Sequence, residues 1–313
     1  MKDRRWHIVL IMVLSLADIF RPSAASAEIV VGDVPLKDNP NVVVGRPNSV
    51  SDTAIVISRR QYVIGWDYER RSPEWVAWTV NKRKLGEAGR SNSFRIDPDL
   101  DAALVEQNRE SVSPDDYRNS CLDRGHQVPS GDRTASETDN ETTFLMSNVM
   151  PQSAFLNRRT WVSLERFVRQ RVLDHNERAA VYAGSILDED TKTIGPKQDI
   201  HVPSANFKII VLMPATREKP SRKEMKYFVV NFPNVTSKGT NPVDDREQAC
   251  WDSEHTIKLG ENNHQAIWRP YLTSLDEVQK SSGISFDFLQ GIEQMTPDQV
   301  DGIIAEGQTA RHQ

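Results

Sequence analysis

Short apolar runs separated by turns predict strands in the first third of the chain. Residues 54–57 and 62–66 form nearly continuous apolar segments, and 75–80 follows after a charged turn. Runs of this length, rich in β-branched and aromatic residues, are typical of buried strands. Their close succession predicts an antiparallel meander.

The same pattern returns downstream, with a helix before it. Further strands are predicted at 179–187, 207–213 and 227–232. Residues 158–174 instead carry apolar positions three or four apart among arginines, which predicts a helix. Strands and helices mixed in this way predict an α+β fold.

The C-terminal part predicts two short helices. A capping serine precedes the helix predicted at 275–280, and Thr296 with Pro297 opens another. We find no internal repeat and no break in composition downstream of the first strands. The sequence therefore predicts one domain over 54–295 and a C-terminal tail with a short helix, 296–313.

Residues 1–27 have the pattern of a secretory signal peptide. A basic start precedes a mostly apolar run at 8–20, and the Ala-Ser-Ala at 25–27 has the form of a cleavage site. Asp18 interrupts the run, and an uncleaved interfacial anchor is the alternative. Residues 28–53, rich in proline and glycine, predict an extended N-terminal arm. We expect export to the periplasm or the extracellular space.

Composition excludes several classes of protein. With 38% hydrophobic and 27% charged residues, the chain is no collagen, long coiled coil or fully disordered protein. No stretch approaches the roughly 20 apolar residues that span a bilayer, so we expect no stable membrane partner. Without residues 1–27 the chain has 35 basic and 42 acidic residues, a net charge of −7. Contact with nucleic acid therefore requires a local basic patch or a metal.

Cys121 and Cys250 are the only cysteines. An even count in an export pathway permits one disulfide, which would close a loop of about 130 residues. Two free buried cysteines are the alternative, because the sequence does not show whether the thiols lie within bonding distance. We favour the disulfide.

The most informative chemistry begins at Asp123-Arg124-Gly125-His126. On a strand, Arg124 and His126 share one face, so a guanidinium and an imidazole point at one site. Arginine binds phosphate oxygens through a fork of donors, and histidine accepts a proton from water near neutral pH. A surface Asp–Arg pair beside a structural histidine is the alternative.

A second group follows at helical spacing. Asn157, Trp161, Glu165 and Arg169 are each four residues apart. The first three are therefore expected to share one face of a helix. An amide oxygen and a carboxylate two turns apart suit a hard divalent cation such as Mg²⁺, which keeps several waters. An exposed ion pair between Glu165 and Arg169 is the alternative.

Residues 157–171 concentrate positive charge within an acidic chain. One glutamate stands there against five arginines, which are Arg158, Arg159, Arg166, Arg169 and Arg171. A basic patch beside Arg124 and His126 is what a phosphate backbone requires. A solvated helix face is the alternative.

These motifs, in this order, resemble the DNA/RNA non-specific endonucleases. This family, the ββα-metal (His-Me finger) nucleases, includes secreted bacterial sugar-non-specific nucleases and mitochondrial endonuclease G. The resemblance rests on segments 123–126, 148–152 and 157–165, and extends upstream to 75–78 and 90–98 and downstream to 201–203 and 207–211. It covers roughly residues 54–290. It implies an α+β, ββα-metal nuclease fold, in which a site strand pair and a metal-binding helix lie beside a central antiparallel sheet flanked by helices.

The resemblance also implies roles for the matching residues around the metal. His126 would be the general base that activates water. Asn157 would be the one direct protein ligand of Mg²⁺, for which Mn²⁺ is a substitute. Glu165 would hold the waters of the metal.

Arginines would bind the substrate. By the resemblance, Arg90 and Arg124 would hold the scissile phosphate, and Arg169 would support the metal-site glutamate and the phosphate. Arg158 and Arg166 of the arginine-rich segment are further candidates for substrate contact. The catalytic arginines are then Arg90, Arg124 and Arg169.

We therefore predict an exported, Mg²⁺-dependent endonuclease that cuts DNA and RNA with little sequence preference, leaving 5′-phosphate ends as the resemblance implies. One alternative is a non-catalytic nucleic-acid-binding protein on the same scaffold. Another is a toxin or effector nuclease with an immunity partner. The polar stretch 237–264 is longer than the resemblance leads us to expect, and its role is open. The sequence also leaves open whether the protein forms a homodimer.

Overall fold

A nine-stranded sheet forms the centre of the computed structural model, which describes residues 28–49, 54–216, 220–260 and 265–309. The strand order is β1-β2-β3-β4-β7-β10-β11-β12, and β13 also pairs with β11. Pairs from β2 to β12 are antiparallel, whereas β1 and β13 lie parallel to their neighbours. The strands are β1 (Ile29–Val31), β2 (Ala54–Ser58), β3 (Val63–Asp67), β4 (Ser72–Val80), β7 (Glu177–Ile186), β10 (Ala205–Pro214), β11 (Lys226–Pro233), β12 (Leu272–Thr273) and β13 (Glu293–Gln294).

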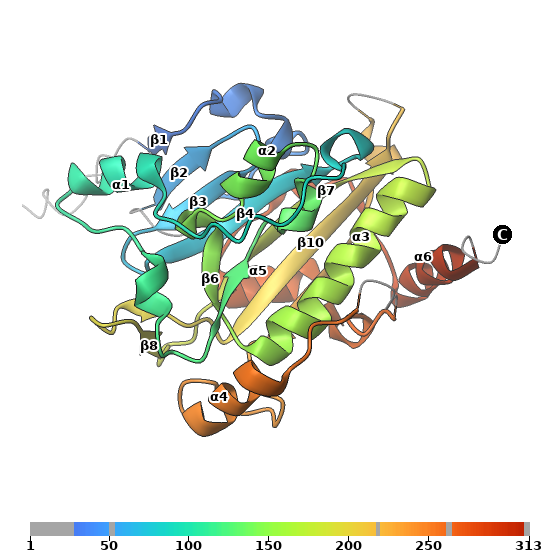
Figure 1. The fold of residues 1–313 in the computed structure, drawn as a ribbon. Coiled ribbons are helices and arrows are strands. Elements are labelled where there is room, and N and C mark those ends of the chain that lie inside the picture. The colour runs from blue at the N-terminus through green and yellow to red at the C-terminus, as the bar shows by residue number, and fades with distance from the viewer. Residues whose placement is uncertain (1–27, 50–53, 217–219, 261–264, 310–313) are drawn as a thin grey trace, which may run out of the picture.

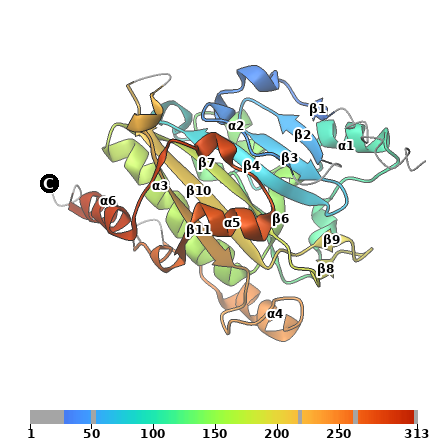
Figure 2. The ribbon, with the colours of Figure 1, turned by 180° about the vertical axis from the view of Figure 1, so that it is seen from behind.

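Both faces of this sheet are covered. In β7, Val181 packs into the core on one face and Tyr182 into the core on the other. Helix α3 (Val162–Asp174) covers the first face, where Leu164 joins the core, and α5 (Leu275–Ser282) covers the second (Figures 1 and 2). Because both faces are covered, all nine residues of β4 are buried. Strands buried in this way are rich in apolar residues along their whole length.

A separate hairpin lies beside the sheet. Strand β5 (Asp123–His126) pairs antiparallel with β6 (Val149–Gln152), and the chain then enters a π-helix, Leu156–Trp161, that runs into α3. The remaining α-helices and strands are α1 (Pro98–Val105), α2 (Glu137–Thr142), α4 (Arg246–His255), α6 (Pro297–Thr309) and a small hairpin of β8 (Thr193–Ile194) and β9 (Ile200–His201).

The predicted strands and the predicted α+β class are confirmed. Strands β2, β3 and β4 form the predicted meander, and β7, β10 and β11 occupy the three downstream runs. Ser274 caps α5, because its hydroxyl oxygen accepts a hydrogen bond from the backbone N–H of Glu277 at 3.1 Å. The C-terminal helix begins at Pro297, as predicted.

The predicted N-terminal arm is more closely bound to the domain than an extended arm. Strand β1, which lies within residues 28–53, pairs with β2 of the central sheet. Asn39 and Asn41 are buried, and their amides donate to the carbonyl oxygens of Arg59 at 2.9 Å and Arg60 at 3.0 Å. The signal peptide predicted at 1–27 lies outside the described residues. None of the helices within the described ranges is long and apolar enough to cross a membrane.

The predicted helix begins differently from the expectation. Its first turn is the π-helix Leu156–Trp161, and regular α-helix starts at Val162. The prediction that Trp161 faces the site with Asn157 and Glu165 is wrong, because Trp161 is buried in the core while the other two line a pocket.

Candidate active site

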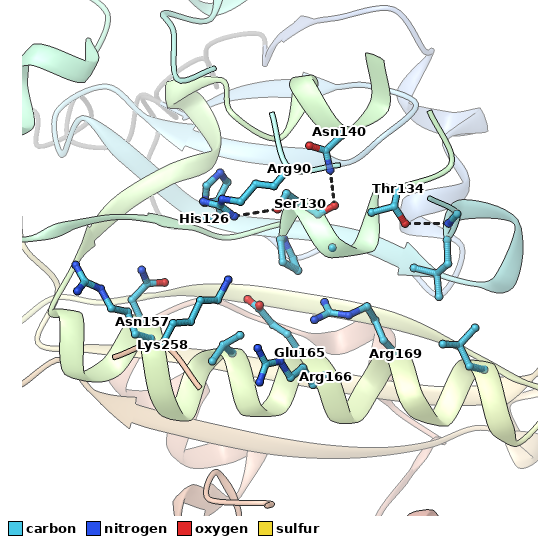
Figure 3. Close-up of a pocket in the computed structure, with 17 residues that line it drawn as sticks. Arg90, His126, Ser130, Thr134, Asn140, Asn157, Glu165, Arg166, Arg169 and Lys258 are labelled. Atoms are coloured by element: carbon cyan, nitrogen blue, oxygen red, sulfur yellow. Dashed lines mark hydrogen bonds between the residues drawn. The ribbon is translucent and has the colours of Figure 1, made fainter. Parts of the chain in front are cut away.

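A pocket opens between the β5–β6 hairpin and helix α3 (Figure 3). The hairpin side contributes Arg90, His126, Ser130 and Asn140, and the facing side contributes Asn157, Arg158, Glu165, Arg166, Arg169 and Lys258. The pocket therefore brings together the predicted residues from three separate motifs. Arg124 is not among the described residues that line it.

The hairpin has room only for glycine at its centre. A Cβ atom at Gly125 would lie 2.2 Å from Oε1 of Gln152 on the paired strand. Asn148 then fixes the chain beyond the strand, since it donates to the carbonyl of Val128 and accepts from its N–H, both at 2.9 Å. These contacts set the position from which His126 faces the pocket.

Aromatic rings enclose the His126 imidazole. The ring of Phe144 meets it edge-on with centroids 4.6 Å apart, and that of Phe94 lies at 5.0 Å. Trp161, from the π-helix, donates to the His126 carbonyl oxygen at 3.1 Å. The ring nitrogen Nε2 is buried and has no hydrogen-bond partner among the described residues. A buried ring nitrogen without a protein partner, on a residue that lines the pocket, is a candidate for a hydrogen bond to a water or substrate.

This environment keeps His126 neutral. Burial lowers the pKa of the imidazole well below its usual value, and the positive charges of Arg90, Lys258 and Arg124 lower it further. A neutral imidazole can accept a proton at physiological pH. The site thus supplies a base rather than a cation at this position.

Asp123 orients Asn157. The Asn157 amide nitrogen donates to Asp123 Oδ2 at 2.8 Å, and Arg158 binds the same carboxylate through Nε at 2.8 Å and Nη2 at 2.6 Å. Only the nitrogen end of an amide can donate to a carboxylate, so the Asn157 oxygen is turned away from Asp123. The first residue of the Asp-Arg-Gly-His motif therefore orients the predicted metal ligand.

Lys208 holds Glu165. Its ammonium lies 3.1 Å from Glu165 Oε1 and 3.8 Å from the centroid of the Trp161 ring. The Lys208 side chain is 1% exposed and that of Glu165 9% exposed. Burial lowers the pKa of the lysine, and Glu165 opposes the shift. The sequence analysis missed this residue, whose one signal is a lone charge in the apolar run 207–213.

Arg169 and Arg90 come from opposite sides of the pocket, and each is braced by a hydrogen bond. Arg169 Nη1 lies 2.8 Å from Asp132 Oδ1, and Trp78 donates to the other oxygen of this buried carboxylate at 2.7 Å. Arg90 donates to the Ser130 hydroxyl at 3.0 Å. Nothing in the sequence pattern pointed to Asp132.

Arg124 lies at the outer edge of the hairpin. Its guanidinium stacks 4.2 Å from the centroid of the Phe94 ring, which itself packs on His126. The side chain is exposed. The structure therefore places Arg124 near the predicted base but outside the pocket lining.

Arg158 and Arg166 direct donors to protein carbonyls. Arg158 Nη1 donates to Ser253 at 2.8 Å and to Thr256 at 3.0 Å, and Arg166 Nη2 donates to Leu259 at 2.7 Å. Both guanidinium groups line the pocket, but these donors hold the segment that follows α4.

The donor set fits a hard, hydrated cation. Within the described ranges, no three His, Cys, Asp or Glu side chains cluster closely enough to hold a metal. The Asn157 oxygen, turned away from Asp123, and the carboxylate of Glu165 line the same pocket. Mg²⁺ keeps several waters and needs few protein oxygens, so the two residues suit it, whereas they suit poorly a metal that needs a full protein cage.

The two cysteines are joined in a disulfide, with their Cα atoms 4.7 Å apart. Cys121 precedes β5 by two residues, and Cys250 lies in α4. The disulfide therefore attaches α4 to the chain that enters the site strand.

Comparisons with known proteins agree with this geometry. A family model for the DNA/RNA non-specific endonucleases matches residues 38–295. A nuclease of Nostoc sp. is 31% identical over 261 residues, which cover 80% of this chain and 81% of that protein. A nuclease of Serratia marcescens is 28% identical over 64% of this chain and 72% of its own. Human mitochondrial endonuclease G is 29% identical over 50% of this chain and 54% of its own.

Among solved structures, that of an EndoG/EndoGI complex aligns with a TM-score of 0.60 and 21% identity, over 84% of this chain and 97% of the other. The hairpin, the helix after it and the flanking sheet define the ββα-metal fold, as predicted. The chain belongs to the DNA/RNA non-specific endonuclease family. It is a nuclease, a hydrolase of phosphodiester bonds.

Proposed function

We propose that this nuclease is a Mg²⁺-dependent endonuclease that hydrolyses both DNA and RNA with little sequence preference and leaves 5′-phosphate ends. One observation carries the proposal. A neutral His126, whose buried Nε2 has no hydrogen-bond partner among the described residues, lines the same pocket as Asn157 and Glu165, on the opposite wall (Figure 3).

The residues divide the work by their chemistry. His126 accepts a proton from the attacking water. Asn157 would hold the cation through its amide oxygen and Glu165 would hold waters of the cation, while Lys208 fixes the carboxylate. When bound, Mg²⁺, or Mn²⁺ in its place, stabilises negative charge on the phosphate and on the leaving 3′-oxygen.

Arginines bind the phosphates. Arg90 and Arg169 reach the pocket from opposite walls, each braced by a hydrogen bond that fixes its guanidinium. Arg124 extends the positive surface outward along the hairpin. Contacts to phosphate carry no sequence information, so a site built on them is expected to cut without strong preference.

Export through the signal peptide predicted at 1–27 completes the proposal. The Cys121–Cys250 disulfide supports it, because such bonds persist in oxidising compartments. Cell fractionation of the full chain tests this point: activity confined to the cytoplasm would contradict it.

Digestion of plasmid DNA and of RNA tests the activity. The protein without residues 1–27 should cut both, stop with EDTA and recover when Mg²⁺ is restored. Cleavage of one nucleic acid alone, or cleavage in EDTA, would contradict the proposal. Cutting that emerges only after a co-purifying protein is removed would favour the toxin alternative.

A further inference from the structure

The polar stretch 237–264, whose role the sequence leaves open, contains a segment that is fixed to the rest of the domain at several points. We call residues 246–260, which are α4 and the chain after it, the anchored segment. Its first anchor is the disulfide from Cys250 to Cys121. The second is Arg158, which donates to the carbonyls of Ser253 and Thr256.

The remaining anchors lie at the end of the segment. Leu259 is buried, and its N–H donates to the backbone carbonyl of Arg158 at 3.0 Å. Arg166 donates to the carbonyls of Leu259, at 2.7 Å, and Gly260. Two arginines of the helix side thus fix the main chain on both sides of Lys258.

Lys258 is directed into the pocket. It is exposed and lines the pocket with Asn157 and Glu165, and Figure 3 shows its side chain extending beside Asn157. Its charge also acts on His126, on the other wall. Among the described residues that line the pocket, Glu165 is the one carboxylate, so the site has an excess of positive charge for a polyanion.

We propose that the anchored segment is a substrate clamp that delivers Lys258 to a phosphate of the bound nucleic acid. The inference rests on the proposed function of the same site. A lysine ammonium offers three donors as a compact charge and suits a phosphate oxygen without demanding one orientation. Arg158 and Arg166 are then positioning residues, because they hold the backbone that carries Lys258.

The salt dependence of binding tests the clamp. Each phosphate contact that is lost lowers the slope of log K against log salt by about 0.9 for duplex DNA. We would measure binding of a labelled duplex in Mg²⁺, in a His126→Ala background that prevents cleavage, for Lys258→Met and Lys258→Arg. Lys238→Met is the matched control, since Lys238 is an exposed lysine of the same polar stretch outside the pocket lining.

We expect Lys258→Met to lower the slope by about one, and Lys258→Arg and Lys238→Met to leave it unchanged. In the otherwise native enzyme, Lys258→Met should raise KM for duplex DNA more than it lowers kcat. An unchanged slope in Lys258→Met, or an equal fall in Lys238→Met, would overturn the clamp. If the native enzyme cuts no nucleic acid, the proposed function fails instead.

A second variant separates positioning from direct contact. Arg166→Met added to Lys258→Met should lower the slope no further, because the contact that Arg166 supports is already absent. A further fall of about one would show that Arg166 itself binds a phosphate, and would overturn its positioning role. Circular dichroism of each variant establishes that the folded protein is being compared.

Discussion

Replacing Lys208 with methionine tests how the protein holds the Glu165 carboxylate of the proposed metal site. Methionine keeps a long apolar stem and removes the ammonium. The Lys208 Nζ to Glu165 Oε1 distance is 3.1 Å, and both side chains are almost fully buried. The substitution therefore leaves a carboxylate without its cation and also removes the contact between the ammonium and the Trp161 ring, 3.8 Å from its centroid.

The burial of this ion pair sets how much stability Lys208→Met should lose. Removing one partner of a buried ion pair typically costs about 3–5 kcal/mol, because the other charge stays buried and uncompensated. We expect a loss of this size in the free energy of unfolding of Lys208→Met. Adding Glu165→Gln should restore much of that stability, since no unpaired charge then remains. It should not restore activity.

Urea unfolding of the single and double variants measures these energies. Lys226→Met is the control, because Lys226 pairs with Glu293 at 3.3 Å but both side chains are about half exposed. Such a surface pair is worth at most about 1 kcal/mol. If Lys208→Met costs no more than Lys226→Met, or if the double variant is less stable than Lys208→Met, our description of this pair is wrong.

Two further predictions concern the base and the disulfide. Because burial lowers the pKa of His126, a plot of kcat/KM against pH should stay level as the pH falls through about 6.5 and should decline only below it, where the imidazole gains a proton; a decline that sets in above 6.5 would contradict the neutral base. Cys250→Ser opens a loop whose ends are 129 residues apart, and it should lower the free energy of unfolding by up to about 4–5 kcal/mol. Urea unfolding with and without reductant checks this, and a native protein indifferent to reductant would contradict it.

The fold was predictable because its strands are buried on both faces. Continuous apolar runs such as 207–213 stand out in the sequence, and β10 occupies that run. The start of the site helix was not predictable in the same way. The π-turn at Leu156–Trp161 uses the same residue types as an α-turn, and the four-residue spacing does not show that Trp161 packs into the core instead of lining the pocket.

The site was predictable where its residues form compact motifs. His126, Asn157 and Glu165 line one pocket, as the motifs implied. Contacts between distant segments gave no such signal. Lys208 meets Glu165 across 43 residues of sequence, and Lys258 reaches the pocket only because tertiary contacts hold its backbone about 100 residues from Arg158. For the same reason, charge alone could not show that Arg158 binds carbonyl groups.

The central claim is that His126 and Asn157 do separate work, and cleavage rate against Mg²⁺ concentration for His126→Ala and Asn157→Ala tests it most directly. His126→Ala removes the proton acceptor and leaves the metal ligands, so a folded protein should lose at least about 10²–10⁴-fold in rate at every Mg²⁺ concentration. Asn157→Ala removes the direct ligand, so raised Mg²⁺ should recover part of its activity. A folded His126→Ala protein that cuts at nearly the native rate, or that Mg²⁺ rescues as it rescues Asn157→Ala, would contradict the account.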